Sequence, residues 1–278
     1  SKLLAATKKR FARANIDGEE AEWIFALTLG IRKSAVSSEE RLLKSEQVRE
    51  ILDMADERLT GRPLWDIVGN TDFYGYELSV DERVLIPRPE TEGLTRLALS
   101  SAEPGDKVLD LCTGSGAIAI ALKKESDKKN MKLLVTACDV SADALEVAKN
   151  NAAKCKAEVK FVQSDLFSRL RGRFNLIVSN PPYIRSAVIP SLQREITEHE
   201  PMLALDGGAD GLEFYRRIIA EAPDHLKKNG VLMMEIGYDQ KEAVKALLHE
   251  SGRFEKIIGL TDLTGKDRIV AATVITVK

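Results

Sequence analysis

The chain is poor in the residues that build disulfide and metal frameworks. Its 278 residues include only three cysteines and three histidines. Cys112, Cys138 and Cys155 are too few and too far apart for a disulfide framework or a zinc site. The histidines show no metal-ligand spacing, so we expect no bound metal. We therefore expect three reduced thiols in a cytoplasmic protein.

Long apolar runs and an excess of one charge sign are also absent. No apolar stretch approaches the ~18–20 residues that span a bilayer, and no signal-peptide pattern opens the chain. We therefore expect no membrane partner. The net charge of −2 argues against a chain dominated by nucleic-acid binding, and we expect no direct contact with nucleic acid. Hydrophobic residues at 44% and charged residues at 30% are typical of an ordinary folded protein.

The first part of the chain has helical periodicity, with apolar residues such as Phe11, Ile24 and Ile51 recurring at helical spacing. A neutral helical block is better suited to binding protein than to coating a phosphate backbone. We predict a helical N-terminal domain over 1–60 that recognises a substrate protein. Residues 61–87 are predicted to form a hairpin linker, in which 73–80 is one strand and 84–86 its partner.

The remainder, 88–278, alternates between strand and helix patterns. Helices are predicted over 117–124, 142–153, 212–227 and 240–250, and strands over 107–111, 133–138, 158–162, 175–179, 231–236, 254–260 and 268–277. This alternation predicts a mostly parallel, doubly wound α/β sheet. Only residues 261–267 separate the last two strands, which is too short for a parallel crossover, so they are predicted to pair antiparallel.

The sequence Asn180-Pro181-Pro182-Tyr183 follows the apolar run 176–178, which predicts a buried strand. Proline fixes φ and donates no N–H, so two prolines end that strand in a rigid turn. The asparagine side chain and the bare backbone carbonyls of such a turn can accept hydrogen bonds from a planar NH2 group. An Asn-Pro turn is common by itself, so its interpretation depends on the rest of the chain.

A glycine-containing loop, 110–116, follows the first strand of the predicted sheet. Gly114 and Gly116 let the backbone turn tightly and approach a ligand, and ligands of α/β sheets bind outside the carboxyl ends of the strands. The dinucleotide fingerprint is incomplete, since Ile118 and Ala119 follow, and this disfavours a dehydrogenase. Asp110 would repel a pyrophosphate but attract the ammonium group of a methionine moiety.

Two further acids follow the next two predicted strands. Asp139 ends the second strand, where a carboxylate can accept hydrogen bonds from both ribose hydroxyls. Asp165 follows the third strand and is placed to receive an adenine amino group. The glycine loop and these two acids, in this order, indicate S-adenosylmethionine as cofactor, with S-adenosylhomocysteine as its product.

Five blocks of sequence carry a family resemblance that runs over nearly the whole chain. The first three are Leu85-Ile86-Pro87-Arg88-Pro89-Glu90-Thr91-Glu92, Asp110-Leu111-Cys112-Thr113-Gly114-Ser115-Gly116-Ala117-Ile118-Ala119 and Val178-Ser179-Asn180-Pro181-Pro182-Tyr183-Ile184. The fourth consists of Glu200-Pro201, Ala204-Leu205 and Gly208-Ala209-Asp210-Gly211-Leu212, and the fifth is Asp262-Leu263-Thr264-Gly265-Lys266-Asp267-Arg268. With these blocks the chain resembles the protein-(glutamine-N5) methyltransferases that modify peptide chain release factors. It departs from them at Cys112, where glycine is usual, and at Leu166, where some members carry an aromatic residue beside the adenine.

The resemblance implies a class I S-adenosylmethionine-dependent methyltransferase fold, a Rossmann-like, mostly parallel seven-stranded sheet with an antiparallel terminal strand. It implies methyl transfer to the side-chain nitrogen of the glutamine in the Gly-Gly-Gln motif of a release factor. We expect the protein to be a monomer. Asn180, Pro181 and Tyr183 would be catalytic, and these three with Pro182 would bind the substrate. The cofactor would contact Asp110, Cys112, Thr113, Gly114, Ser115, Gly116, Asp139, Asp165, Leu166 and Asn180.

Other interpretations use the same residues. A nucleic-acid methyltransferase acting on the exocyclic amine of adenine or guanine would hold that amine at Asn180 and stack Tyr183 on a flipped base. The neutral N-terminal domain and the block 87–92 argue against it. A non-catalytic binding module is disfavoured by the intact Asp110, Asp139 and Asn180. Arg88 and Glu90 either fasten the linker over the cofactor or mark the start of a helix, where acids are favoured.

Overall fold

The computed structural model describes residues 2–38 and 42–275. By contact, the chain divides into two units. The first, here called the helical unit, is Ser1–Gly69 together with Gln193–His199, and the second, the sheet unit, is Asn70–Leu192 together with Glu200–Lys278. The segment 61–87, predicted to be a linker, is shared between the two units.

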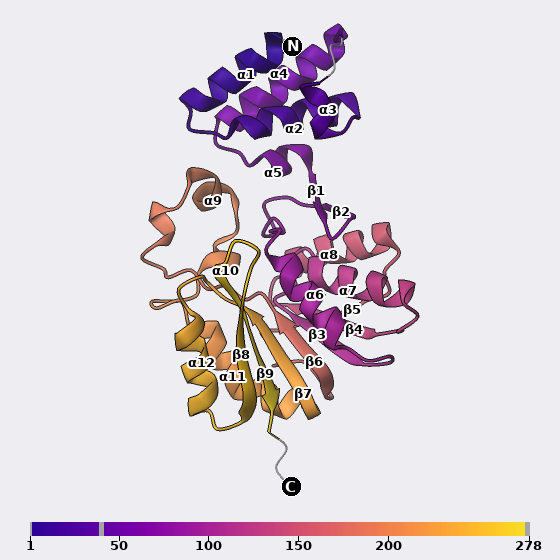
Figure 1. Ribbon diagram of the computed structural model, residues 1–278, viewed down its shortest axis with the longest axis vertical. Coiled ribbons are helices and arrows are strands. Elements are labelled where there is room, and N and C mark those ends of the chain that lie inside the picture. Colours follow the sequence, from indigo (N-terminus) through magenta and orange to yellow (C-terminus); the bar gives the residue numbers. More distant parts are fainter. Residues whose placement is uncertain (1, 39–41, 276–278) are drawn as a thin grey trace. The chain divides into compact units, whose positions relative to one another are not determined.

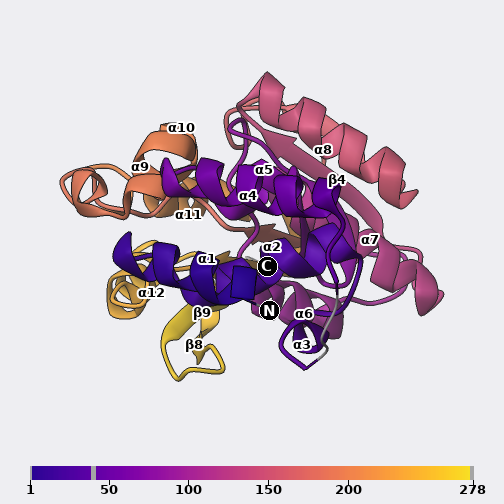
Figure 2. The ribbon, with the colours of Figure 1, turned by 90° about the horizontal axis from the view of Figure 1, so that it is seen from above.

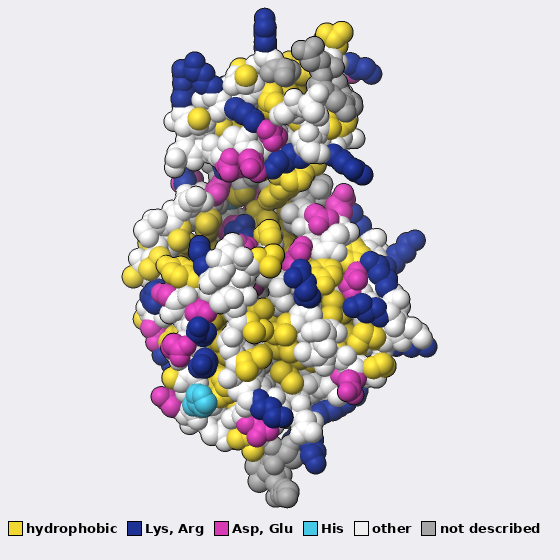
Figure 3. All heavy atoms as spheres, viewed as in Figure 1, with side chains coloured by type: hydrophobic (Ala, Val, Ile, Leu, Met, Phe, Trp, Pro, Cys, Tyr) yellow, Lys and Arg dark blue, Asp and Glu magenta, His cyan; other side chains and the backbone are white. Residues whose placement is uncertain are grey.

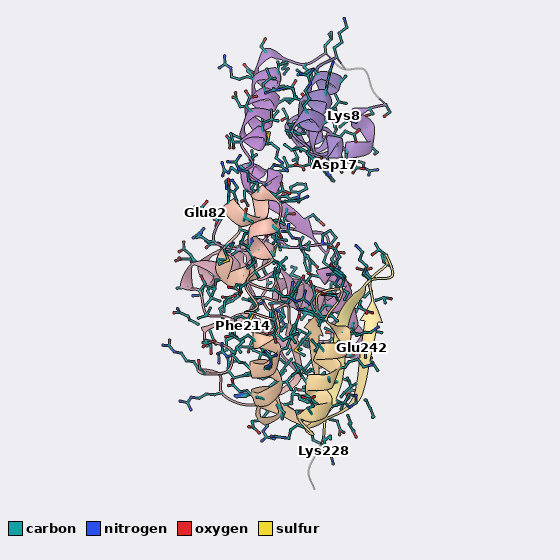
Figure 4. All side chains as sticks on the ribbon, turned by 90° about the vertical axis from the view of Figure 1, so that its left-hand side faces the viewer. Lys8, Asp17, Glu82, Phe214, Lys228 and Glu242 are labelled. Carbon is teal, nitrogen blue, oxygen red and sulfur yellow. The ribbon has the colours of Figure 1, made fainter. Side chains whose placement is uncertain are left out.

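The helical unit consists of α1 (Lys2–Arg13), α2 (Gly18–Leu29), α3 (Lys33–Val36), α4 (Ser45–Leu59), α5 (Leu64–Val68) and α9 (Arg194–His199). Figures 1 and 2 show α2 beside both α1 and α4. Phe11, Ile24 and Ile51, one from each of these helices, are fully buried together. Asp17, labelled in Figure 4, caps α2 by accepting a 2.9 Å hydrogen bond from the Glu19 N–H.

A short hairpin begins the sheet unit, and it differs from the prediction. Strands β1 (Asn70–Phe73) and β2 (Tyr76–Ser79) pair antiparallel. The predicted single strand over 73–80, with 84–86 as partner, is wrong because Tyr74 (φ 57°) and Gly75 (φ 79°) form the turn. Two successive residues with positive φ match the twist of a tight hairpin, and the preceding residues 70–73 supply the second strand.

The main sheet has the strand order β5-β4-β3-β6-β7-β9-β8. Its strands are β3 (Lys107–Leu111), β4 (Leu134–Asp139), β5 (Lys160–Gln163), β6 (Phe174–Ser179), β7 (Leu226–Glu235), β8 (Phe254–Thr261) and β9 (Asp267–Val274). The pairs from β5 to β7 are parallel, and β9 lies antiparallel between β7 and β8. The predicted mostly parallel sheet with an antiparallel terminal strand is confirmed. Positions 276–277 of the predicted last strand lie outside the described residues.

Helices cover both faces of this sheet (Figure 1). Helices α6 (Thr91–Ser101), α7 (Ala117–Lys128) and α8 (Ala142–Cys155) lie on one face, and α11 (Glu213–His225) and α12 (Lys241–Glu250) on the other. Along β3, Val108 belongs to the core under the first three helices, whereas Leu109 and Leu111 belong to the core under the other two. Strands buried on both faces need near-continuous apolar sequence, which is why these strands were recognisable as apolar runs.

Two short elements, η1 (Ile189–Ser191) and α10 (Met202–Leu205), lie in the segment between β6 and α11. Across the part of the chain that the structure describes, no helix is both long and apolar enough to cross a membrane. Within residues 2–38 and 42–275, no group of three or more His, Cys, Asp or Glu side chains is arranged to hold a metal ion.

Candidate active site

The candidate site lies where the strand order of the sheet reverses. β3 is flanked by β4 on one side and β6 on the other, and in α/β sheets the crevice at such a point binds the ligand. A pocket that is open to solvent lies there. Its lining includes Cys112, Gly114, Asp139, Asp165, Leu166, Asn180 and Pro182, all predicted site residues.

Asp110, at the end of β3, closes the glycine loop onto the start of α7. Its Oδ2 accepts hydrogen bonds from Thr113 Oγ1 at 2.6 Å and from the Ala119 N–H at 3.2 Å. The side chain is 0% exposed and does not line the pocket, and burial raises its pKa to about 7. Its Oδ1 is buried and, among the described residues, has no hydrogen-bond partner. This oxygen is an acceptor still available at the loop.

Positions 114 and 116 of the loop are glycine for two different physical reasons. Gly114 has a φ of +52°, and a Cβ atom built on it would meet nothing within 4 Å, so the space beside it is open to a ligand. Gly116 has a φ of +83°, and a Cβ there would lie 3.1 Å from the Ala148 Cβ atom. Gly116 therefore lets α7 approach α8 closely. Thr113, Ser115 and Gly116 shape the loop without lining the pocket.

Cys112 lines the pocket in a strained backbone conformation. Its φ is +58°, in the left-handed region where a residue with a Cβ atom costs about 1–2 kcal/mol. Burial, with Asp139 close by, raises the pKa of its thiol well above the ordinary value. The side chain is thus a neutral thiol at physiological pH, in a position whose backbone favours glycine.

The acids after β4 and β5 differ in their surroundings. Asp139 accepts hydrogen bonds from the N–H groups of Gly114 and Ser141 at 2.9 and 3.0 Å, and burial raises its pKa. Asp165 is exposed, and its Oδ1 pairs with Arg217 at 2.7 Å, so an adenine amino group would share this carboxylate with a cation. Leu166 beside it is buried, with a φ of +44°.

The residues present fit S-adenosylmethionine in three respects. The Asp110 Oδ1 atom is an unused buried acceptor near the loop, the Asp139 carboxyl faces the pocket, and the space beside Gly114 is open. Phe214, on α11 and labelled in Figure 4, adds an aromatic wall to the pocket that sequence reasoning missed. The other lining residues it missed are Arg83, Val84, Leu85, Val140, Ser141, Ala144, Ser164, Pro201, Leu203 and Ala204. Phe214 follows the block 208–212 in sequence, and that proximity is the only signal that could have indicated it.

Asn180, directly after β6, lies at the edge of the same pocket. Its side-chain NH2 group donates to the Thr91 hydroxyl at 3.3 Å. None of the described residues donates a hydrogen bond to its Oδ1 atom. The structure therefore brings Asn180 and Pro182 together with Gly114 and Asp139 at one pocket.

Tyr183 is a partly buried side chain that packs against the hydrophobic core and does not line this pocket. Its hydroxyl donates to Glu235 Oε1 at 3.4 Å, and its backbone carbonyl accepts from Gln240 Nε2 at 2.9 Å. Burial, with Glu235 nearby, raises the pKa of its phenol. Tyr183 is thus fixed at both its side chain and its backbone.

The segment 204–212 supports the backbone of the Asn-Pro-Pro-Tyr loop. The Ile184 N–H donates to the Leu205 carbonyl at 3.0 Å, and the Gly207 N–H donates to the Ile184 carbonyl at 2.8 Å. A Cβ atom on Gly211 would lie 2.5 Å from the Tyr183 carbonyl oxygen. Gly211 is there because the two backbones touch, whereas Gly208 has a φ of +87° and faces the Glu213 side chain.

Arg88 forms an ion pair with Glu200, whose side chain is almost entirely buried. Glu90 precedes α6 without accepting a hydrogen bond from its first turn. Arg88 therefore joins the block 85–92 to the residues that directly follow α9. That Arg88 and Glu90 fasten the linker over the cofactor stays a prediction.

Comparisons with known proteins place the chain among methyltransferases. Residues 94–208 match the model of the methyltransferase small domain family. The chain is 36% identical to a release factor glutamine methyltransferase of Agrobacterium fabrum, over 96% of this chain and 94% of that protein. It is 40% identical to a protein of the same name from Chlorobaculum tepidum, again over 96% and 94%. A methyltransferase structure from Pyrococcus furiosus matches with a TM-score of 0.53 and 20% identity, over 72% of this chain and 89% of that one, which shows the fold.

Proposed function

The chain belongs to the release factor glutamine methyltransferase family, and we propose that its Asn-Pro-Pro-Tyr loop holds the side-chain amide of the target glutamine. Its activity is the S-adenosylmethionine-dependent methylation of a release factor glutamine. We propose that this glutamine belongs to the Gly-Gly-Gln motif and that the new methyl group goes to its amide nitrogen.

The glycine loop and the pocket would hold the cofactor. We assign its methionine end to the loop with Asp110, Cys112 and Gly114, its ribose to Asp139, and its adenine to the region of Leu166. Bound S-adenosylmethionine supplies an electrophilic methyl group on a sulfonium. A pocket at the carboxyl ends of β3 and β4, open beside Gly114, supports this placement.

The loop would help the amide nitrogen of the glutamine, a poor nucleophile, to attack the methyl group. An amide nitrogen reacts slowly because its lone pair is delocalised into the carbonyl. The Asn180 Oδ1 atom and the Pro181 carbonyl can each accept one N–H of the glutamine NH2 group. These hydrogen bonds orient the nitrogen and strengthen as it becomes positively charged. By analogy with oxyanion-hole donors, each acceptor would lower the activation free energy by about 3 kcal/mol. Pro182 and Tyr183 would complete the wall against which the amide rests.

One observation carries this proposal. Asn180 lines the cofactor pocket with its NH2 group already bonded to Thr91, while its Oδ1 atom receives no hydrogen bond from the described residues. An amide fixed in this way offers an acceptor, and the substrate of the family is a donor with two N–H groups.

The helical unit would bind the release factor outside the glutamine motif. It contains α9, which follows the Asn-Pro-Pro-Tyr loop in sequence and is held to α4 by the buried Arg58. Arg58 also pairs with Glu20 of α2 at 2.5 Å, so one side chain ties α9 to both α2 and α4. We propose that the protein acts in the cytoplasm as a monomer.

Nucleic acid is not part of the proposed reaction. The net charge is −2, and Figure 3 shows Lys and Arg side chains interspersed with Asp and Glu over the face that it presents. A phosphate-binding surface would require a basic patch. The protein is therefore proposed to discriminate its substrate through protein contacts.

The test is incubation with S-adenosylmethionine and a purified release factor, followed by mass spectrometry of the Gly-Gly-Gln peptide. One added methyl group on that glutamine is the expected result. Methylation of single-stranded DNA or RNA in a parallel reaction, with the release factor unmodified, would instead support the exocyclic-amine alternative.

A further inference from the structure

The hydrogen-bond chain behind Asn180 begins at a buried carboxyl group. Glu235 ends β7 and is 1% exposed. The parallel register of β6 and β7 sets Ser179 opposite Met234, so Asn180 and Glu235 each follow one residue later on neighbouring strands. Glu235 is consequently behind the Asn-Pro-Pro-Tyr loop and outside the residues that line the pocket.

Thr91 lies between these two residues. It is the first residue of α6, it is buried, and its hydroxyl donates to Glu235 Oε2 at 2.7 Å. A threonine hydroxyl has one hydrogen to donate and two lone pairs that accept. When Glu235 is ionised, the hydrogen of Thr91 is used by the carboxylate, and the oxygen of Thr91 can then only accept from Asn180. The 3.3 Å contact with Asn180 must therefore involve the amide NH2 group.

This chain fixes which end of the Asn180 amide faces the pocket. An asparagine side chain rotated by half a turn would present NH2 to the substrate, and two NH2 groups repel one another. With its NH2 group at Thr91, the Oδ1 atom is the end that remains for the glutamine. Glu235 also accepts from Tyr183 through its other oxygen, so one carboxyl group holds both ends of the loop.

We propose that Thr91, anchored by Glu235, is a positioning residue that selects the reactive orientation of the Asn180 amide. This inference rests on the proposed role of Asn180. It also gives a chemical reason for a threonine in the block 85–92, which the cofactor pocket and the substrate loop do not otherwise explain.

The test compares Thr91→Val, which removes the hydroxyl at nearly constant volume, with Thr91→Ser, which keeps it. Single-turnover methylation of a release factor is expected to slow at least tenfold in Thr91→Val and less than threefold in Thr91→Ser. The Kd for S-adenosylmethionine is expected to stay within twofold of wild type in both. Thr95→Val is the matched control, because Thr95 is fully buried one turn later on α6 and, among the residues that the structure describes, its hydroxyl bonds only to the Thr91 carbonyl of the same helix, at 3.4 Å.

A double-mutant cycle separates positioning from a general structural effect. If Thr91 acts through Asn180, Thr91→Val adds less than twofold to the loss already caused by Asn180→Ala. Independent, multiplying losses would overturn the inference, as would a Thr91→Val enzyme of wild-type rate, while either result would leave the role of Asn180 intact. An Asn180→Ala enzyme of wild-type rate would overturn the proposed function and this inference together.

Glu235→Met tests the anchor. The substitution removes both acceptor oxygens and fills a similar volume. We expect a loss of turnover at least as large as that of Thr91→Val, without a change in the Kd for the cofactor. Wild-type turnover in this variant would overturn the part assigned to Glu235.

Discussion

Gly207 lies so close to Tyr183 that a Cβ atom on Gly207 would come within 2.6 Å of the Tyr183 Cα atom. The nearest atoms that this Cβ would meet, the Cα and carbonyl carbon of Tyr183, belong to the backbone and so cannot rotate away. The spacing of the Asn-Pro-Pro-Tyr loop from the segment 204–212 is therefore set by the absence of a side chain at position 207.

Gly207→Ala is expected to displace the loop. Overpacking of this kind costs about 1–3 kcal/mol, and the shift falls on the residues that would hold the glutamine. Turnover is expected to fall at least tenfold, with a lower thermal midpoint. Gly93→Ala in α6 is the control, since a Cβ atom there would meet only the Ile269 Cδ1 atom at 3.8 Å. Equal turnover in the two variants would contradict the spacing role.

At position 112 we expect glycine to give a more stable protein than alanine, which is the reverse of their usual order. At its φ of +58°, glycine avoids the cost of a Cβ atom, whereas in ordinary backbone glycine is the less stable residue. Cys112→Gly should therefore be more stable than Cys112→Ala by about 1 kcal/mol, because both lack the thiol and differ only at Cβ. Urea unfolding of the two variants measures the difference, and a more stable alanine variant would show that the strain is absent.

Glu235 is expected to make stability fall as pH rises. Burial raises its pKa from 4.5 to about 7, an effect that Glu90 increases and Thr91, Arg268 and Tyr183 reduce. The folded state then holds a proton that the unfolded state has lost. The contribution of Glu235 to the free energy of unfolding is therefore greatest below about pH 4.5, falls between pH 4.5 and 7, and stays constant above pH 7.

Glu235→Gln removes this titration. Between pH 5 and pH 8, the free energy of unfolding of the wild type is expected to fall by up to about 3 kcal/mol more than that of Glu235→Gln. Asp110 titrates in the same range in both proteins, so the difference between them isolates Glu235. Parallel pH profiles would mean that Glu235 has an ordinary pKa.

Releasing α9 from the helical unit is expected to raise the KM for a whole release factor more than the KM for a short peptide. Glu195→Lys places a cation beside the buried Arg58, whereas Glu198→Lys on the same helix disturbs an exposed ion pair with Arg194. The KM for an intact release factor should rise several-fold in Glu195→Lys and much less in Glu198→Lys. The KM for a short Gly-Gly-Gln peptide should change in neither. An equal rise for both substrates in Glu195→Lys would contradict the proposed role of the helical unit.

The sheet and the residues at its carboxyl ends were predictable because their signals are local. A parallel strand buried on both faces is a continuous apolar run, as in 176–178, and the residue that follows it necessarily lies at the ligand-binding edge. Gly114, Asp139 and Asn180 were identified in this way, and the structure brings all three to one pocket.

What could not be predicted depends on tertiary contacts. Thr91 and Glu235 are 144 residues apart, and only the packing of the start of α6 against the end of β7 brings them together beside Asn180. The pairing of Asp165 with Arg217 likewise depends on the approach of α11. The hairpin turn was missed because Tyr74, an aromatic residue in an alternating segment, predicts a strand and yet adopts a positive φ.

The most direct test of the central claim is the single-turnover rate of glutamine methylation by Asn180→Ala at saturating S-adenosylmethionine. Loss of the Oδ1 acceptor is expected to slow transfer about a hundredfold or more, with the Kd for the cofactor within a few-fold of wild type. A variant that binds the cofactor and methylates the release factor at close to the wild-type rate would contradict the assignment of Asn180 as the acceptor that holds the substrate amide.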